Sequence, residues 1–192
     1  MPRAGLNQQI VVREAARLAD EVGWPRLTLA ALAARLGVAL PSLYKHVRNA
    51  DALAQKVSAL ATAELAAELT TAAAGRAGTD ALRAVAAAYR SYALRHPGRY
   101  PATQQVPDPA DPEHVTAGER AVGAIYAILH GYGITGDDAV DAARGVRSAL
   151  HGFVSLEAAG GFGLPRDVGR SYDHLIEALD VALRSWPGGR PS

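Results

Sequence analysis

The chain has 192 residues, of which 49% are hydrophobic and only 6% aromatic, with 20 Lys/Arg against 19 Asp/Glu. It contains no cysteine, which excludes disulfides and thiolate chemistry, and no apolar run reaches the ~18 residues that a membrane span needs. Alanine, the residue with the highest helix propensity, is abundant, so the composition favours an all-α fold. Because no leader-like segment opens the chain, we expect a soluble, cytoplasmic protein.

The charged residues are distributed unevenly along the chain. Residues 1–56 carry eight Lys/Arg and four Asp/Glu, a balance of +4, and the remaining residues carry 12 and 15, a balance of −3. Both lysines, Lys45 and Lys56, lie in the basic part. A basic N-terminal part joined to an acidic remainder is typical of a protein that binds DNA at one end and has another task at the other.

The first predicted elements are two helices, over about 7–22 and from Thr28 to about 36. Gly23 ends the first, and the Thr28 hydroxyl is placed to cap the second. Leucines at 3–4-residue spacing give the second helix one apolar face. Gly37 follows directly after that face, where the left-handed backbone of a helix end suits glycine.

A third helix begins near Leu40, with Pro41 in its first turn, where the missing N–H costs nothing. Leu43 and Val47 point inward. The polar side chains left on the open side are Ser42, Tyr44, Lys45 and His46. Two short helices joined by a tight turn form a helix-turn-helix, whose second helix lies in the major groove of DNA.

The rest of the chain also has helical periodicity. Asn49 is placed to cap a helix over about 50–74, which we interpret as a connector. The expected later elements are a helix over about 80–95, a short segment over 101–106, a helix over 113–130, a helix capped by Asp137 and reaching about 159, a helix capped by Asp167 over about 168–183, and a tail over 187–192.

The helix-turn-helix region resembles a known family. The run L-G-V-x-x-P-S-L-Y-x-H-V-x-N over 36–49, preceded by T-L-x-x-L-A, closely resembles the DNA-binding domain of the TetR family of bacterial transcription regulators. The resemblance implies an all-α protein with a DNA-binding domain over 1–50 and a helical effector-binding and dimerisation domain over 51–186. An αα-hairpin with the same core and no DNA contact is the alternative.

The second part resembles the Trp-His-Gly subtype of TetR-like C-terminal domains. The resemblance is carried by 95–98 (Arg-His-Pro-Gly), by 150–157, which contains His151-Gly152, and by Gly160-x-Phe162. No tryptophan precedes His151, where Arg147 and Ser148 stand. The resemblance implies a domain that binds a small ligand and forms a homodimer.

We assign DNA contacts to the exposed residues of the motif. The predicted phosphate contacts are Thr28, Tyr44, His46 and Arg48, and the residues predicted to face the base edges are Leu40, Pro41, Ser42 and Lys45. Lys45 can donate to guanine O6 and N7. Alternatively, Tyr44 packs against the first helix with only its hydroxyl exposed. Ala50 stands where the family often has a phosphate-binding lysine. Ala30 likewise supplies no hydrogen-bond donor to a base, so recognition of the base sequence is expected to depend on few polar groups.

Two further sets of residues are predicted from helical spacing. The effector pocket is assigned to Tyr89, Tyr92, Tyr126, His130 and His151. Core packing is the more frequent explanation for the three tyrosines and His130, and a hydrogen bond in the core is the alternative for His151. The dimer interface is assigned to Val146, Ala149, Phe153, Leu175 and Leu179. A helix that is apolar on more than one face needs two partners, and small residues permit close approach.

The predicted function is a repressor that binds a pseudo-palindromic double-stranded DNA operator as a homodimer, with no membrane partner. An effector, expected to be small and apolar, would respace the two recognition helices and release the operator. No nucleophile-base spacing or phosphate loop appears, so neither an enzyme nor a cofactor is expected. The residues whose types and spacing best fit a metal site are Asp173, His174 and Glu177, which fall on about one turn of a helix. Polar residues on the exposed face of an amphipathic helix give the same pattern, so no metal is expected. The alternatives are a regulator that responds to a protein partner and a helical enzyme or carrier that retains a helix-turn-helix.

Overall fold

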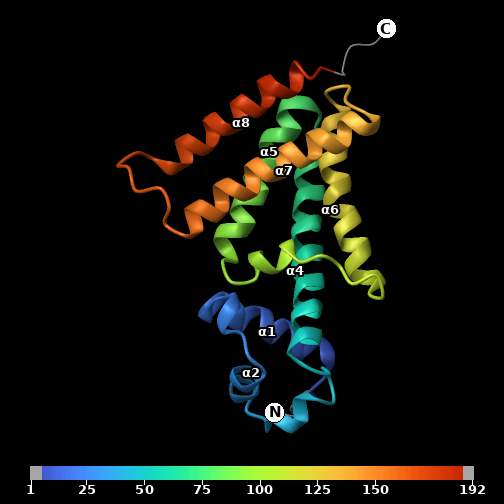
Figure 1. Ribbon diagram of the computed structural model, residues 1–192, viewed down its shortest axis with the longest axis vertical. Helices are drawn as coiled ribbons and strands as arrows, with labels where there is room; N and C mark the ends of the chain where they lie inside the picture. Colours follow the sequence, from blue (N-terminus) through green and yellow to red (C-terminus); the bar gives the residue numbers. More distant parts are fainter. Residues whose placement is uncertain (1–5, 188–192) are drawn as a thin grey trace. The chain divides into compact units, whose positions relative to one another are not determined.

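The structure, a computed structural model, describes residues 6–187. Within this range the chain forms eight α-helices and two 3₁₀ helices and no strands, so the predicted all-α fold is confirmed (Figure 1). The chain divides into two compact units. Unit 1 comprises residues 1–64 and 96–118, and unit 2 comprises 65–95 and 119–192. No helix in the described part is both long and apolar enough to cross a membrane.

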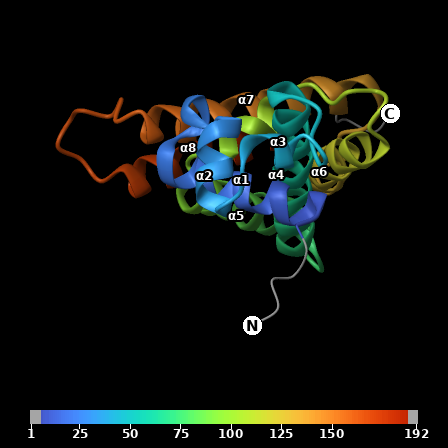
Figure 2. The ribbon, with the colours of Figure 1, turned by 90° about the horizontal axis from the view of Figure 1, so that it is seen from below.

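Unit 1 begins with three helices around a small core. They are α1 (Gln8–Val22), α2 (Leu29–Leu36) and α3 (Leu40–Leu43), with the 3₁₀ helix η1 (Trp24–Arg26) after α1. Figure 2 shows these helices beside the start of α4 (Ala50–Ala73). Their shared core is formed by residues from all four α-helices and the turn after α3, including Val11, Leu32, Leu43, Val47 and Val57.

Unit 1 also contains a second stretch of chain, far away in sequence. This stretch includes the 3₁₀ helix η2 (Tyr100–Gln104) and the first turns of α6 (Pro112–His130). Asp20 joins α1 to it: the Asp20 carboxylate accepts hydrogen bonds from the Arg99 backbone N–H and from Arg99 Nε, both at 2.8 Å. The Arg99 guanidinium also contacts Glu64 of α4, at 2.9 Å.

Unit 2 is a bundle built from the ends of α4 and α6 and from three further helices. These are α5 (Gly78–Arg95), α7 (Gly136–Ala158) and α8 (Val168–Arg184), which pack against one another in pairs. The buried side chains include Leu82, Tyr92, Ile128, Leu150 and Ile176. Asp180 of α8 accepts hydrogen bonds from Thr79 Oγ1 at 2.7 Å and from the Tyr132 hydroxyl at 2.5 Å, which fixes the end of α8.

Most of the expected helix ends are confirmed because their signals are local. The side chains of Thr28, Asn49 and Asp167 accept backbone N–H groups at the starts of α2, α4 and α8. The prediction that Asp137 caps α7 was wrong, because Thr135 has the extended backbone of an N-cap and α7 begins at Gly136. Asp137 instead lies in the first turn, where a negative charge is favourable beside the helix dipole.

The short segment expected over 101–106 is η2, a 3₁₀ helix rather than an α-helix. The division at residue 50 remains a prediction, and the tail expected over 187–192 lies outside the described residues except for Pro187.

Candidate nucleic-acid interface

The helix-turn-helix is held in shape by local hydrogen bonds. Thr28 Oγ1 accepts from the backbone N–H of Ala31 at 3.1 Å, and Gly37 ends α2 with φ of 65°, a conformation that suits glycine. Leu32 of α2 and Leu43 of α3 are fully buried, so the core fixes how the two helices cross. The core therefore fixes the orientation of α2 and α3 relative to each other.

The regular helix that follows the turn is shorter than the sequence predicted. The α-helix covers only Leu40–Leu43, and residues 44–46 continue as turns, with His46 N–H donating to the Leu43 carbonyl at 2.8 Å. Leu43 and Val47 point inward as predicted. The middle and the C-terminal end of this recognition segment, residues 40–47, are thus anchored in the core.

The residues assigned to DNA lie mainly on the outside of unit 1. The Tyr44 residue is 52% exposed, which argues against packing of its ring on α1. The other residues assigned to DNA are Thr28, Pro41, Lys45 and Arg48, which are exposed, and Leu40, Ser42 and His46, which are half-buried. No ion pair of Lys45 or Arg48 is found among residues 6–187, so both cations face solvent.

Contacts from α1 hold the recognition segment and α2 in place. Gln8 Nε2 donates to the His46 carbonyl at 3.0 Å, and Arg35 of α2 forms ion pairs with Glu14 at 3.1 Å and Glu21 at 2.6 Å. Sequence reasoning did not identify these positioning residues because their partners lie 14 to 38 positions away.

The five residues assigned to the effector pocket do not share one environment in unit 2. Tyr89 and Tyr92 of α5 are buried in the core. Tyr126 and His130 lie on the exposed side of α6, because Ile125, Ile128 and Leu129 form its buried stripe. His151 of α7 is half-buried, 3.3 Å from Ser155 Oγ, and burial lowers its pKa, as does the nearby charge of Arg147.

An open groove of about 640 Å³ follows α5 and α8 on unit 2. Its lining combines apolar residues with charged ones, namely Arg83, Ala87, Arg90, Ser91, Leu94, Arg95, Tyr172, Asp173, Ile176 and Glu177. Arg90 is fixed by a two-pronged ion pair with Glu157, at 2.5 and 2.8 Å, and these hydrogen bonds raise the pKa of Arg90. None of the five residues assigned to the effector lines this groove.

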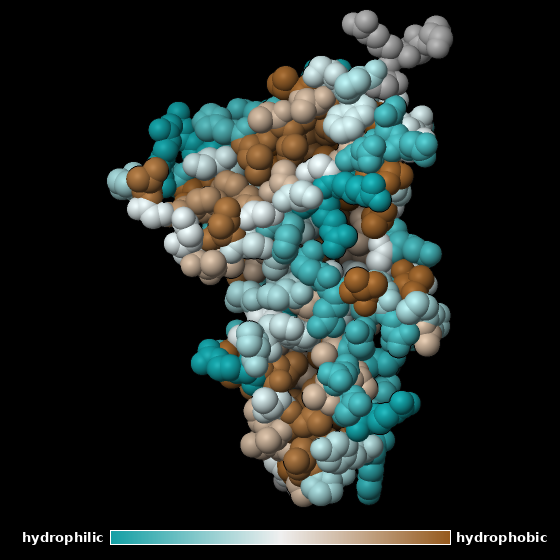
Figure 3. Space-filling model, viewed as in Figure 1, coloured by the Kyte–Doolittle hydropathy of each residue, from teal (hydrophilic) through white to brown (hydrophobic). Residues whose placement is uncertain are grey.

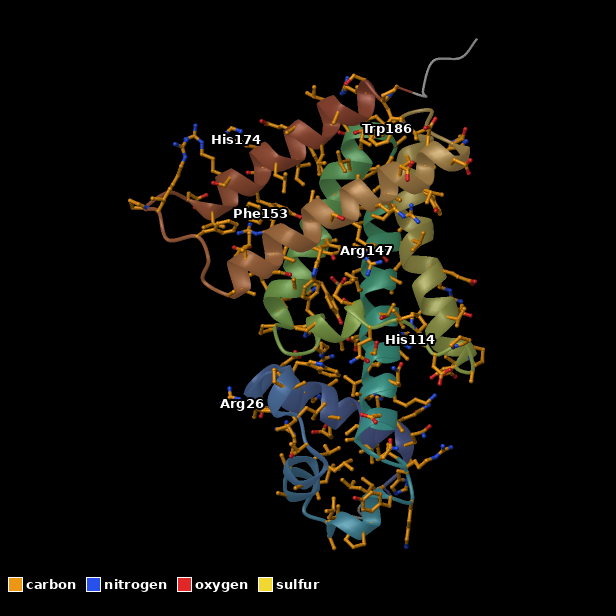
Figure 4. All side chains as sticks on the ribbon, in the orientation of Figure 1. Arg26, His114, Arg147, Phe153, His174 and Trp186 are labelled. Carbon is orange, nitrogen blue, oxygen red and sulfur yellow. The ribbon has the colours of Figure 1, made fainter. Side chains whose placement is uncertain are left out.

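The residues assigned to the dimer interface lie on α7 and α8. Val146 is only 2% exposed, so it belongs to the core of unit 2, whereas Ala149, Phe153, Leu175 and Leu179 are partly exposed. Figure 3 shows a hydrophobic patch over α7 and α8. Phe153 lies between these helices (Figure 4), with ring centroids 4.8 Å from Phe162 and 4.9 Å from Tyr172.

Polar residues on the outer side of α8 pair with one another. His174 Nδ1 lies 3.1 Å from Glu177 Oε2. Within residues 6–187, no group of three or more His, Asp or Glu side chains is placed to hold a metal ion. The cluster of Asp173, His174 and Glu177 is therefore an exposed polar surface.

Comparisons with known proteins match both parts of the chain. Residues 11–57 match the family described as bacterial regulatory proteins, tetR family, and residues 82–179 match the family described as tetracyclin repressor-like, C-terminal domain. The chain is 42% identical over 158 residues to the HTH-type transcriptional regulator Rv0681 of Mycobacterium tuberculosis, covering 82% of this chain and 72% of that protein. It is 30% identical over 189 residues to the HTH-type transcriptional regulator YobS of Bacillus subtilis, covering 98% and 94%.

A solved structure supports the same assignment. The structure of a TetR variant from Acinetobacter baumannii in complex with minocycline superposes with a TM-score of 0.68 at 26% identity, covering 97% of this chain and 99% of that one. Both of these relatives are named as HTH-type transcriptional regulators. With an exposed recognition segment on a helix-turn-helix core and both parts of the chain matched, the protein belongs to the TetR family of DNA-binding transcriptional regulators.

Proposed function

We propose that this regulator is a repressor that binds a pseudo-palindromic operator as a homodimer and leaves it when a small effector binds. The observation that carries the proposal is the recognition segment, which buries Leu43 and Val47 and leaves Tyr44 and Lys45 exposed. A segment anchored in this way presents a fixed set of polar groups to the major groove. Because bacterial DNA lies in the cytoplasm, the protein would work there.

The exposed side chains suggest a division of labour on DNA. Thr28, Tyr44, His46 and Arg48 would contact phosphates and position the domain, since phosphate contacts carry no sequence information. Leu40, Pro41, Ser42 and Lys45 would face the bases, with Lys45 as the main hydrogen-bond donor and Leu40 as an apolar contact for a thymine methyl group.

Two substitutions separate these roles. Tyr44→Phe removes one hydroxyl and is expected to weaken binding to operator and random DNA by the same factor, about fivefold. Lys45→Ala is expected to weaken operator binding by roughly tenfold to a hundredfold and random DNA by much less, because a base contact is lost. Fluorescence anisotropy with both DNAs measures the two ratios. Equal losses on both DNAs for Lys45→Ala would rule out its role in base reading.

Operator binding should also depend steeply on salt. Each neutralised phosphate contributes about −0.9 to the slope of log affinity against log salt, so about three cationic contacts in each of two domains give roughly −5. Between 50 and 200 mM salt the affinity should fall by about a thousandfold. Titrations at several salt concentrations measure this slope, and a slope near zero would contradict DNA binding through phosphates.

The proposed dimer uses the partly exposed apolar faces of α7 and α8. Ala149, Phe153, Leu175 and Leu179 keep exposed surface that a second copy could cover, whereas Val146 would only support them from the core. Two such helices from each copy would form a symmetric interface in which the same patch meets itself. This symmetry would space the recognition segments by about one DNA turn, roughly 34–36 Å or somewhat more.

The proposed effector is a small molecule, consistent with the minocycline bound by the related TetR of Acinetobacter baumannii. The groove of unit 2 offers room for such a ligand, with Ala87, Leu94 and Ile176 as its apolar lining beside charged residues, whereas Tyr89 and Tyr92 are buried in the core. The decisive test is to select genomic DNA fragments that the protein binds, read the shared sequence, and screen compounds for release of that DNA. A shared inverted repeat is expected, and fragments without one would contradict the proposal.

A further inference from the structure

The second half of the recognition segment has little regular structure to hold it. Residues 44–46, all assigned to DNA, form turns after α3 ends at Leu43. The Leu43 carbonyl accepts the N–H groups of His46 at 2.8 Å and Val47 at 3.0 Å. In the described part of the chain, no backbone N–H donates to the carbonyls of residues 44–46, which are orphaned as at any helix end. The orientation of these peptides therefore depends on contacts from outside the segment.

One side chain supplies such a contact. Gln8, the first residue of α1, donates from Nε2 to the His46 carbonyl at 3.0 Å. Within residues 6–187, no other side chain donates to the backbone of residues 40–47. Leu43 and Val47 hold the segment by burial, which has no preferred direction. The bond from Gln8 is directional, so it fixes the rotation of the peptide that follows His46.

Gln8 extends from a helix that is itself fixed at several points. Asn7 caps the start of α1, with Oδ1 accepting a backbone N–H at 2.9 Å. Val11, one turn further along, is fully buried in the core that α1 shares with the recognition segment. Towards the other end, Asp20 accepts the backbone N–H of Arg99 at 2.8 Å. The donor therefore has a fixed origin, and its hydrogen bond relates the turn to the core of unit 1.

We propose that Gln8 is a positioning residue for base recognition, which holds the turn at residues 44–46 so that Lys45 reaches the base edges in one orientation. This inference rests on the proposed role of Lys45 in reading bases. Lys45 lies one residue before the peptide that Gln8 fixes. A small rotation of the backbone there displaces the end of a long side chain much further than the backbone itself. Gln8 acts through Lys45 and touches no base.

The positioning can be measured without DNA. Gln8→Met keeps the length and the helix propensity of the side chain and removes the donor. In ¹⁵N relaxation of the free protein, the order parameters of residues 44–46 should fall from about 0.85, typical of a rigid backbone, toward about 0.6. Gln8→Lys, which keeps a donor, should restore them, and Gln9→Met, at the exposed neighbouring position, should leave them unchanged. Unchanged order parameters in Gln8→Met would overturn the proposal.

The effect on recognition is measured by fluorescence anisotropy with operator and random DNA. Gln8→Met should lower the ratio of operator affinity to random affinity about fivefold, the effect of losing one hydrogen bond. The slope of log affinity against log salt should stay at the wild-type value, because Gln8 is uncharged and no cationic phosphate contact is removed. Equal losses on both DNAs would show that Gln8 contacts phosphate or supports the whole domain, and the proposal would be wrong.

A double-mutant cycle shows whether Gln8 acts through Lys45. In the Lys45→Ala background, Gln8→Met should change the affinity ratio less than about twofold, because the side chain that it positions is gone. The full fivefold effect in that background would contradict the proposal. If Lys45→Ala alone leaves the ratio unchanged, the proposed base-reading role fails and this inference fails with it. Unchanged order parameters in Gln8→Met would refute the inference alone and leave the proposed function standing.

Discussion

Replacing Gly98 with alanine is expected to destabilise unit 1 by at least about 3 kcal/mol, because the backbone of α1 occupies the space that the new methyl group needs. A Cβ atom at Gly98 would overlap the carbonyl oxygen of Ala19 and lie 2.5 Å from the backbone nitrogen of Asp20. Neither backbone atom can rotate away as the end of a side chain would. The substitution must therefore separate α1 from the segment that follows α5.

That separation would also break the hydrogen bonds around Asp20. Asp20 Oδ1 accepts the backbone N–H groups of Gly98 at 3.2 Å and Arg99 at 2.8 Å, and Asp20 Oδ2 accepts from Arg99 Nε at 2.8 Å and lies 3.2 Å from His96 Nδ1. Arg99 is only 8% exposed. Removing one partner of a buried ion pair is costly because the remaining charge stays desolvated.

Thermal unfolding followed by circular dichroism measures the loss. For a chain of this size, 3 kcal/mol corresponds to a fall in Tm of about 6–12 °C. The matched control is Gly118→Ala, also in unit 1, where the new Cβ would lie 3.7 Å from Pro107 Cγ, an ordinary contact. That variant should be at least as stable as the wild type, because alanine favours a helix over glycine. If the two variants unfold alike, α1 does not pack on Gly98 as described.

Local signals explain how much of the fold was predictable. The side chains of Thr28 and Asp167 cap the residues three positions ahead, and Gly37 adopts its left-handed backbone where the leucine pattern ends. Such interactions operate within one turn, so one sequence is enough to find them. The start of α7 was missed because both Thr135 and Asp137 have side chains typical of an N-cap.

The parts that were not predictable depend on contacts between distant residues. Asp20 and Arg99 are 79 positions apart, and Gln8 and His46 are 38 apart, so periodicity does not reveal either pair. The same limit applies to Val146. The apolar residues of α7 form two stripes, and the sequence does not show which of them packs on α5 and α8 in the same subunit.

The outer stripe of α7 leads to the prediction with the largest expected effect on DNA binding. Gly145, Ala149, Gly152 and Leu156 follow one another along the helix, and Leu156 is 52% exposed. A methyl group added at Gly145 or Gly152 would meet no atom within 4 Å. Glycine in a helix costs about 1 kcal/mol relative to alanine, and packing within one chain gives no reason for it here. Close approach of a second copy would give one.

Ala149→Arg is therefore expected to give folded monomers. Formation of the symmetric dimer would bury the introduced guanidinium charges of both copies in the interface, which is unfavourable. Operator affinity should fall by about 10²–10⁴-fold, since each half-site is then bound without the effective concentration that a linked partner provides. Light scattering gives the mass, circular dichroism the fold, and anisotropy the affinity. Leu179→Arg should behave in the same way, whereas Ala127→Arg, on an exposed position of α6, should leave all three unchanged.

The outcomes distinguish the possible positions of this stripe. A variant that loses its helical signal would indicate that Ala149 belongs to the core of its own subunit. A folded Ala149→Arg protein that still has the mass of a dimer would show that the interface lies on another face. Folded monomers with unchanged affinity for a single half-site but weak binding to the whole operator would place α7 and α8 between the two copies, because only the link between the recognition segments would have been lost.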